Sequence, residues 1–140
     1  MDWRLITDDG VSASFGLSAD ETIAERVGRG KSVPTLRLYT YRSTCALVGR
    51  FQNVPNELRV DFCREHQIPI NRRPTGGGAI IMGEDQLGIA LSLPANAEDT
   101  YSRAREIMSQ FSEAIVRGLS DFGVEAHFHR KNDIVASGKK

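Results

Sequence analysis

Short apolar segments alternate with polar ones over the first two thirds of the chain, and they predict strands separated by helices. Residues 2–7 (DWRLIT), 35–41 (TLRLYTY), 45–49 (CALVG), 68–71 (IPIN) and 79–82 (AIIM) have the alternating or continuous apolar pattern of short strands. Ser18 and Glu21 have the spacing of a capping box, so we expect a helix from Ser18 that ends before Gly28. A second helix is expected over 56–66, with Leu58, Phe62 and Cys63 facing inward.

The segment QLGIALSLP at 86–94 predicts a strand with two unlike faces. Leucine and isoleucine share one face, which we expect to fill a core. Gly88, Ala90 and Ser92 share the other face. Small residues on a strand leave room for a neighbouring backbone, a helix or a ligand. We expect either close helix packing or a slot for an apolar chain on this face.

The strongest helical pattern covers 100–122, where apolar residues recur at intervals of three and four up to Gly123 and predict an ordinary core-facing stripe. Residues 124–129 and the segment from 132 onward predict two more strands. Strands interleaved with a few helices indicate an α/β protein, a mixed sheet with packed helices. The length of 140 residues fits one domain over 1–140.

Charge and composition narrow the function. Lys plus Arg and Asp plus Glu both number 18, so no overall field favours nucleic acid or an anionic membrane, and we expect neither as a partner. The start MDWRLITDDG has no signal-peptide pattern, which predicts a cytoplasmic protein. Cys45 and Cys63 lack metal or redox spacing and are expected to be buried thiols. His127 and His129 have no further ligands with zinc spacing, so no metal site is expected.

The segment RRPTGGGAI at 72–80 is the best candidate site. Three consecutive glycines expose backbone N–H groups, and Arg72 and Arg73 add cationic forks, a combination suited to phosphate or carboxylate. The spacing matches neither a P-loop nor GxGxxG. A flexible hairpin with solvated arginines is the alternative.

Together with GRFQN at 49–53 and NDIVASGKK at 132–140, this segment resembles the lipoate-protein ligase family of the biotin and lipoate ligase superfamily. The resemblance implies a catalytic domain of the type shared with class II aminoacyl-tRNA synthetases. It implies activation of lipoate by ATP, with Mg²⁺, to lipoyl-AMP and transfer to a lysine of a lipoyl carrier domain. That carrier would be a 2-oxoacid dehydrogenase E2 subunit or the glycine cleavage H protein.

The resemblance also implies roles for individual residues. Lys140 matches the active-site lysine of the family, where its charge would stabilise the departing phosphate. The residues expected to bind substrate or adenylate are Arg72, Arg73, Thr75, Gly76, Gly77, Gly78, Ala79, Ile80, Ile81, Asn132 and Asp133.

Two departures from the family pattern leave other functions open. Met82 stands where many relatives have a histidine, and the family domain continues past its lysine, so we expect a truncated domain or one completed by a second chain. An octanoyl- or lipoyl-transferase of the same fold, which acts through a cysteine and without ATP, is the near alternative. A non-catalytic module that binds lipoyl domains or small acids is the next, and biotin ligation is the weakest.

Overall fold

The computed structural model describes residues 2–94, 100–129 and 133–139, and the chain divides into two compact units, Met1–Pro94 and Ala95–Lys140. Each unit is described by itself. Among the described residues, no helix combines the length and the apolar character that a membrane span requires.

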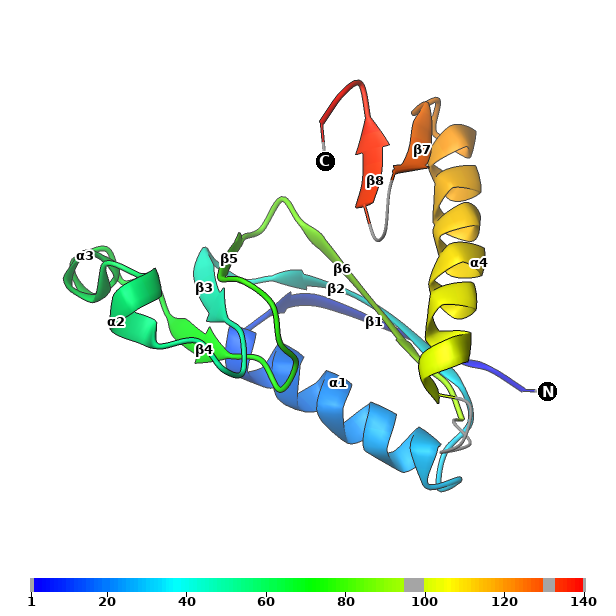
Figure 1. Ribbon diagram of the computed structural model, residues 1–140, viewed down its shortest axis with the longest axis horizontal. Coiled ribbons are helices and arrows are strands. Elements are labelled where there is room, and N and C mark those ends of the chain that lie inside the picture. Colours follow the sequence, from blue (N-terminus) through cyan, green and yellow to red (C-terminus); the bar gives the residue numbers. More distant parts are fainter. Residues whose placement is uncertain (1, 95–99, 130–132, 140) are drawn as a thin grey trace. The chain divides into compact units, whose positions relative to one another are not determined.

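The first unit is built on a three-stranded sheet (Figure 1). The strands β1 (Arg4–Val11), β2 (Thr35–Tyr41) and β6 (Leu87–Ser92) lie in the order β1-β2-β6, with β1 parallel and β6 antiparallel to β2. The helix α1 (Ala13–Gly28) connects β1 to β2 and packs against β2 and β6. These elements confirm the predicted strands at 2–7, 35–41 and 86–94.

Helix α1 begins earlier than the capping-box spacing predicted. Its N-cap is Ser12, whose hydroxyl accepts a hydrogen bond from the N–H of Phe15 at 3.3 Å. Ser18 therefore lies inside the helix. Because Ser12 already satisfies a free N–H of the first turn, a cap at Ser18 is not needed.

A second, smaller sheet holds the glycine run. Its strands β3 (Cys45–Val48), β4 (Ile70–Arg72) and β5 (Ile80–Met82) lie in the order β4-β3-β5. Each of them overlaps an apolar segment that was predicted as a strand. Two short helices, α2 (Val54–Glu57) and α3 (Val60–Glu65), replace the single helix predicted over 56–66. Cys63 is buried as expected, but Phe62 is exposed. Figure 1 shows α2 and α3 extending away from the sheets of this unit.

The buried face of β6 is the opposite of the one we predicted. Gly88 and Ser92 are buried, whereas Leu87 and Ile89 are 56% and 44% exposed. The register explains the difference, since Tyr39 of β2 is paired with Gly88, and its ring occupies the space where a side chain at 88 would lie. The small residues of β6 make room for large side chains of the neighbouring strand.

The core of this unit lies where α1, β2 and β3 meet. Its buried members are Val11, Ala13, Tyr39, Tyr41, Cys45 and Leu47, with Leu17, Met82 and Ala90 packed against them. Ala90 is therefore part of the core. The core unites the two sheets, because β3 and β5 supply Cys45, Leu47 and Met82.

The second unit consists of the helix α4 (Thr100–Asp121) and an antiparallel hairpin of β7 (Ala126–His129) and β8 (Asp133–Ala136). The helix confirms the predicted helical segment, but two residues of its predicted core-facing stripe, Met108 and Phe122, are exposed. Helix α4 contacts β7, so the hairpin folds back against the helix that precedes it.

Candidate functional site

The glycine loop, residues 73–78, is fixed to the end of β3 by backbone and side-chain hydrogen bonds. The N–H of Arg73 donates to the carbonyl of Val48 at 2.9 Å, and the N–H of Arg50 donates to the carbonyl of Thr75 at 2.8 Å. The glycine loop is thus hydrogen-bonded to the GRFQN segment at 49–53, so these two segments fold together.

The two arginines before the glycines hold the glycine loop and the GRFQN segment together. Arg73 donates through Nη1 to the carbonyl of Leu47 at 3.1 Å. Through Nη2 it donates to the carbonyls of Gly76 at 3.1 Å and Gly78 at 2.9 Å. Because charged donors form strong hydrogen bonds, Arg73 defines the path of the loop. The proposed contacts of these guanidinium groups with an anion remain a prediction.

Arg72 holds the GRFQN turn as Arg73 holds the glycine loop, by donating hydrogen bonds to backbone carbonyl groups. Its Nη1 lies 2.9 Å, 3.1 Å and 2.8 Å from the carbonyl oxygens of Gly49, Arg50 and Gln52. These contacts collect the carbonyl groups of the GRFQN turn around one cation. The guanidinium groups of both arginines are therefore hydrogen-bonded to backbone carbonyls, unlike the solvated arginines of the alternative.

The positions of the glycines differ in whether the fold requires glycine there. A Cβ at Gly49 would lie inside van der Waals contact of the Gly77 carbonyl, so the loop packs directly on the Gly49 backbone. Gly77 has φ +100°, a value that favours glycine. Gly76 and Gly78 have neither a positive φ nor, within the described structure, any atom within 4 Å of an added Cβ. Their surfaces are open to an approaching group.

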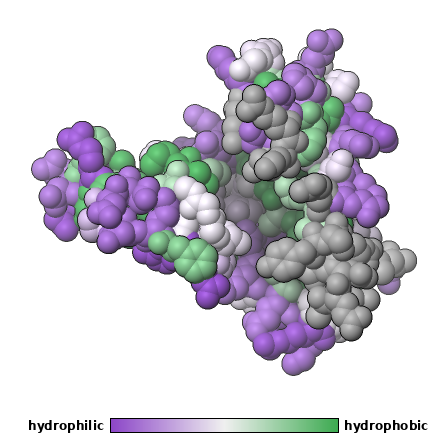
Figure 2. Space-filling model, viewed as in Figure 1, coloured by the Kyte–Doolittle hydropathy of each residue, from purple (hydrophilic) through white to green (hydrophobic). Residues whose placement is uncertain are grey.

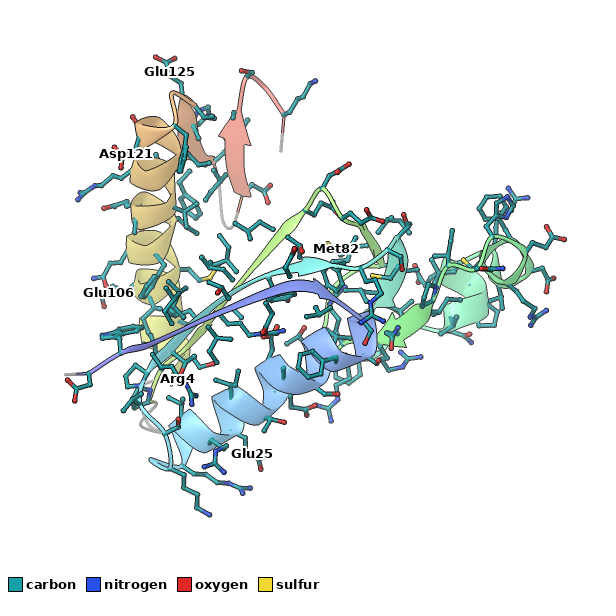
Figure 3. All side chains as sticks on the ribbon, turned by 180° about the vertical axis from the view of Figure 1, so that it is seen from behind. Arg4, Glu25, Met82, Glu106, Asp121 and Glu125 are labelled. Atoms are coloured by element: carbon teal, nitrogen blue, oxygen red, sulfur yellow. The ribbon has the colours of Figure 1, made fainter. Side chains whose placement is uncertain are left out.

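A cavity of about 320 Å³ lies behind the loop. Its wall includes the apolar side chains of Leu17, Leu47, Ile80, Met82 and Ile89. The polar residues that line it are Asp20, Glu21, Tyr39, Tyr41, Arg73 and Thr75. Met82 comes from β5 and lies beside the strands of the larger sheet (Figure 3). The methionine at the family's histidine position therefore lines the cavity and packs against the core.

A buried charged network, which the sequence analysis did not find, lies beside this cavity. Arg37 is 1% exposed and donates to Asp8 Oδ2 and Asp20 Oδ1, each at 2.7 Å, and to the carbonyl of Gly16 at 3.1 Å. The hydroxyl of Tyr39 donates to Asp20 Oδ2 at 2.9 Å. The signal in the sequence was Arg37 on the same strand face as Thr35, Tyr39 and Tyr41.

Burial changes the titration of this network. Burial opposes the charge of Arg37, but its hydrogen bonds to Asp8 and Asp20 outweigh this effect and raise the pKa of Arg37. Burial, with the neighbouring Tyr41 and Asp20, raises the pKa of Tyr39 far above its ordinary value. Both groups therefore keep their protons throughout the neutral range.

Neither cysteine is placed as a nucleophile. Cys45 is 1% exposed and Cys63 is 7% exposed, and both are free thiols. Burial raises the pKa of Cys45, against an opposing hydrogen bond from the Met82 backbone. Since the thiolate is the reactive form, Cys45 is held in the unreactive one. The prediction of two buried thiols is confirmed.

The structure brings only some of the predicted site residues together. Thr75, Ile80 and Arg73 line the cavity, whereas Ile81 is 55% exposed and lines a different surface with Thr44 and Met82. Of the other predicted residues in this segment, Arg72 ends β4, and Gly76, Gly77, Gly78 and Ala79 lie in the connection between β4 and β5.

The other predicted site residues belong to the second unit. Asp133 is half-buried at the start of β8, where it is paired with His129. Asn132 and Lys140 lie outside the described residues, so their roles remain predictions.

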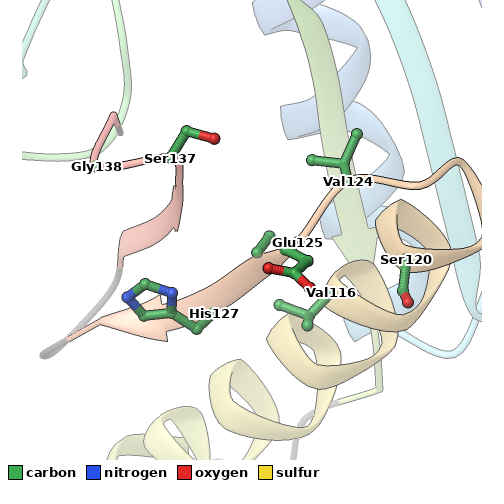
Figure 4. A pocket seen from close by; sticks show the side chains of 8 residues that line it. Val116, Ser120, Val124, Glu125, His127, Ser137 and Gly138 are labelled. Atoms are coloured by element: carbon green, nitrogen blue, oxygen red, sulfur yellow. The ribbon is translucent and has the colours of Figure 1, made fainter.

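The second unit has a cavity of its own, of about 570 Å³, between α4 and the hairpin (Figure 4). Val116, Ser120, Val124, Glu125, His127 and Ser137 are among the residues that line it. His127 and His129 have ring centroids 6.2 Å apart. Over the described residues, no cluster of three or more His, Cys, Asp or Glu side chains is arranged to hold a metal.

Comparison with known proteins places this arrangement in a family. The chain is 32% identical over 126 residues to octanoyltransferase LipM of Exiguobacterium sp. (strain ATCC BAA-1283 / AT1b), covering 90% of the chain and 45% of that protein. The chain spans about half the length of the curated relatives it matches.

Two solved structures share the fold. A bi-partite lipoate protein ligase from Thermoplasma acidophilum, solved in a study with its E2 lipoyl domain, is 24% identical with a TM-score of 0.79. The match covers 98% of this chain and 52% of that one. A lipoate-protein ligase A bound with ATP is 26% identical with a TM-score of 0.76, and the match covers 100% of this chain and 55% of that one.

These matches confirm the predicted mixed α/β fold of the biotin and lipoate ligase type. The sequence profile of the lipoyl protein ligase A/B catalytic domain matches residues 12–140, almost the whole chain. The chain belongs to the lipoyl protein ligase A/B catalytic domain family.

Proposed function

We propose that this chain supplies the acyl-group pocket of an enzyme that transfers an octanoyl or lipoyl group to a lysine of a lipoyl carrier domain. The observation that carries the proposal is the cavity behind the glycine loop, which has an apolar wall and is also lined by Arg73, Pro74 and Thr75, the residues that directly precede the three glycines. An acyl chain would occupy the apolar part, and its carboxyl-derived end would lie against the glycines.

The composition of the cavity suits such a chain. Burying methylene groups contributes about 0.8 kcal/mol each, so an eight-carbon chain gains roughly 5 kcal/mol from apolar walls. Leu17, Leu47 and Ile89 provide such walls from three elements. Tyr39 and Asp20, which are hydrogen-bonded to each other, add a polar surface to the same cavity. An apolar acyl chain that covered this surface would remove its contact with water without replacing those hydrogen bonds, so we expect the acyl chain to lie on the apolar wall.

Gly76 and Gly78 support a role for the loop in binding the reacting end. Neither position needs glycine for its backbone conformation or for packing within the described structure. A close approach of substrate to the main chain is the remaining physical reason for glycine there. Loop N–H groups would then stabilise the negative charge that develops on the acyl carbonyl oxygen.

We favour a transferase that takes the octanoyl group from an acyl thioester. The support is the relative at 32% identity, which is an octanoyltransferase. The octanoyl group would pass first to a cysteine of the enzyme and then to the carrier lysine. Over these two steps the thioester C–S bond of the donor breaks and an amide C–N bond forms to the lysine. The free thiol leaves with the proton given up by the amine. Cys45 and Cys63 are too buried to carry the acyl group between the two steps.

The second candidate is ATP-dependent ligation of lipoate, supported by the likeness to the ligase bound with ATP. In that reaction the carboxylate would first attack ATP and release pyrophosphate. The carrier lysine would then displace AMP. ATP and Mg²⁺ would be required, and Lys140, Asn132 and Asp133 would have the roles that the resemblance implies.

The test supplies an apo lipoyl carrier domain with either octanoyl thioester or octanoate, ATP and Mg²⁺, and follows the carrier mass. Lipoate and biotin serve as comparison acids. Transfer from the thioester alone supports the transferase, and transfer that requires ATP supports the ligase. If neither donor modifies the carrier but octanoate still binds, the chain is a binding module and the proposal of catalysis is wrong.

The glycine loop gives a sharper prediction. Gly78→Ala should lower acyl transfer at least tenfold while the midpoint of urea unfolding stays within the error of the parent, because an added methyl meets only the substrate. The measurement is the rate of carrier acylation alongside urea unfolding. An active variant would show that the substrate does not contact this glycine.

A further inference from the structure

A large apolar side chain stands in water at the edge of the glycine loop. Phe51 is 85% exposed, and the guanidinium of Arg50 lies 5.6 Å from the centre of its ring. Single exposed apolar residues are common and need no explanation by themselves. The surroundings of Phe51 set it apart.

The turn that presents Phe51 is held by several hydrogen bonds. The N–H of Gly49 donates to Gln52 Oε1 at 2.8 Å, and the N–H of Gln52 donates back to the Gly49 carbonyl at 3.1 Å. Arg72 Nη1 collects the carbonyl groups on both sides of Phe51. The backbone on either side of Phe51 is thus held by the hydrogen bonds that also join this turn to Arg72. A backbone that is already ordered loses little further freedom on binding.

The charge around Phe51 is positive and partly unpaired. Residues 50–73 contain five arginines and three acidic residues. Arg64 is paired with Asp61 at 2.9 Å. Arg72 and Arg73 donate to carbonyl groups. Arg50 takes part in none of the ion pairs found among the described residues.

A second contact between an arginine and a phenylalanine ring lies at the nearby helix α3. The guanidinium of Arg59 lies 5.5 Å from the centre of the Phe62 ring, and Phe62 is 43% exposed. The surface of the α2–α3 region is a mixture of hydrophilic and hydrophobic side chains (Figure 2). Arginine and aromatic residues are the types that dominate binding energy in protein interfaces.

We propose that Arg50 and Phe51 form the docking surface for an acidic face of the protein domain that presents the acceptor lysine. This inference rests on the proposed function, because it names the partner that the same site serves. Phe51 would be buried in an apolar recess of that domain, and Arg50 would pair with a carboxylate beside it. The Arg50 N–H bonded to Thr75 links this surface directly to the loop.

The experiment measures binding and transfer with an apo lipoyl carrier domain from a 2-oxoacid dehydrogenase E2 subunit. Phe51→Ala should raise the Kd for the carrier, measured by calorimetry, at least tenfold. Phe122→Ala is the matched control, because Phe122 is 87% exposed in the other unit, and its Kd should stay within twofold. Arg50→Gln should weaken binding at low salt and flatten its salt dependence, whereas Arg117→Gln on α4 should do neither.

A partial reaction separates this inference from the proposed function. Hydroxylamine replaces the carrier as a small acceptor of the octanoyl group. Because hydroxylamine also cleaves thioesters without a catalyst, the reaction without protein is subtracted, and the protein-dependent rate of octanoyl hydroxamate formation by Phe51→Ala should match that of the parent. If the parent makes neither hydroxamate nor acylated carrier, the proposed function fails, and the binding titration still decides the docking surface. Equal carrier affinity of Phe51→Ala and the parent would overturn the docking surface, as would absence of binding by the parent below 1 mM.

Discussion

Individual glycines around the loop have different physical reasons for being glycine. At Gly49 the neighbouring Gly77 carbonyl occupies the space of a side chain, and at Gly77 the backbone itself has a positive φ. At Gly76 neither reason applies. Glycines required by the fold are therefore separable by substitution from those proposed to face the substrate.

Gly49→Ala should destabilise the protein by roughly 1–3 kcal/mol, the range for forcing extra atoms into a packed site. Its methyl group would push the loop away from β3. Gly76→Ala is the control and should change the free energy of unfolding by no more than about 0.5 kcal/mol. Urea unfolding of both variants checks the difference, and equal stability would mean that the loop does not pack on Gly49.

At the scale of elements, the Arg37 network joins β1, β2 and α1. Asp8 comes from β1, Arg37 and Tyr39 from β2, and Asp20 from α1. The Arg37 guanidinium also lies 4.2 Å from the centre of the Tyr39 ring. A buried cation with two carboxylates is costly to break, because removal of one partner leaves a buried charge uncompensated.

The raised pKa of Tyr39 predicts a loss of stability in alkali. Above the unfolded tyrosine pKa of about 10, the unfolded chain releases a proton that the folded protein keeps, so the free energy of unfolding falls as pH rises. Below that pH the tyrosine contributes no slope. Urea unfolding between pH 8 and pH 11 should show a steeper fall for the parent than for Tyr39→Phe. The same slope in both would exclude Tyr39 as the cause.

At the scale of the whole molecule, the proposed functions are divided between the two units. Every residue that lines the cavity behind the glycine loop belongs to Met1–Pro94, as does the loop itself. Asp133 belongs to Ala95–Lys140, as do the positions 132 and 140. The proposed acyl-binding cavity and the lysine to which the resemblance assigns the catalytic role are thus encoded in different parts of the chain.

A fragment of residues 1–94 should therefore bind octanoate with an affinity within about tenfold of the parent but transfer no acyl group. Calorimetry measures the binding, and carrier mass measures the transfer. The fragment must first show cooperative urea unfolding. A folded fragment without octanoate binding would show that the second unit contributes to the cavity.

Much of this arrangement could be predicted from the sequence, because it depends on residues close together in the chain. The glycine run with its arginines, the strands on either side and the long helix over 100–121 are local patterns. The family was likewise readable from three short segments in order. Helix α1 shows the limit of local patterns, since both Ser12 and Ser18 offered a cap and only Ser12 is used.

Only the tertiary structure decided which face of β6 is buried, since alternation defines two faces without saying what covers each. Tyr39 lies against Gly88 because β2 and β6 pair in that register, and Leu87 and Ile89 on the other face are left exposed. Likewise, Arg37 finds its two carboxylates on elements 29 and 17 residues away. In a sequence, a charged residue within a strand predicts an exposed position. Burial becomes possible only when a partner of opposite charge, often distant in the chain, compensates the cost of removing the charge from water.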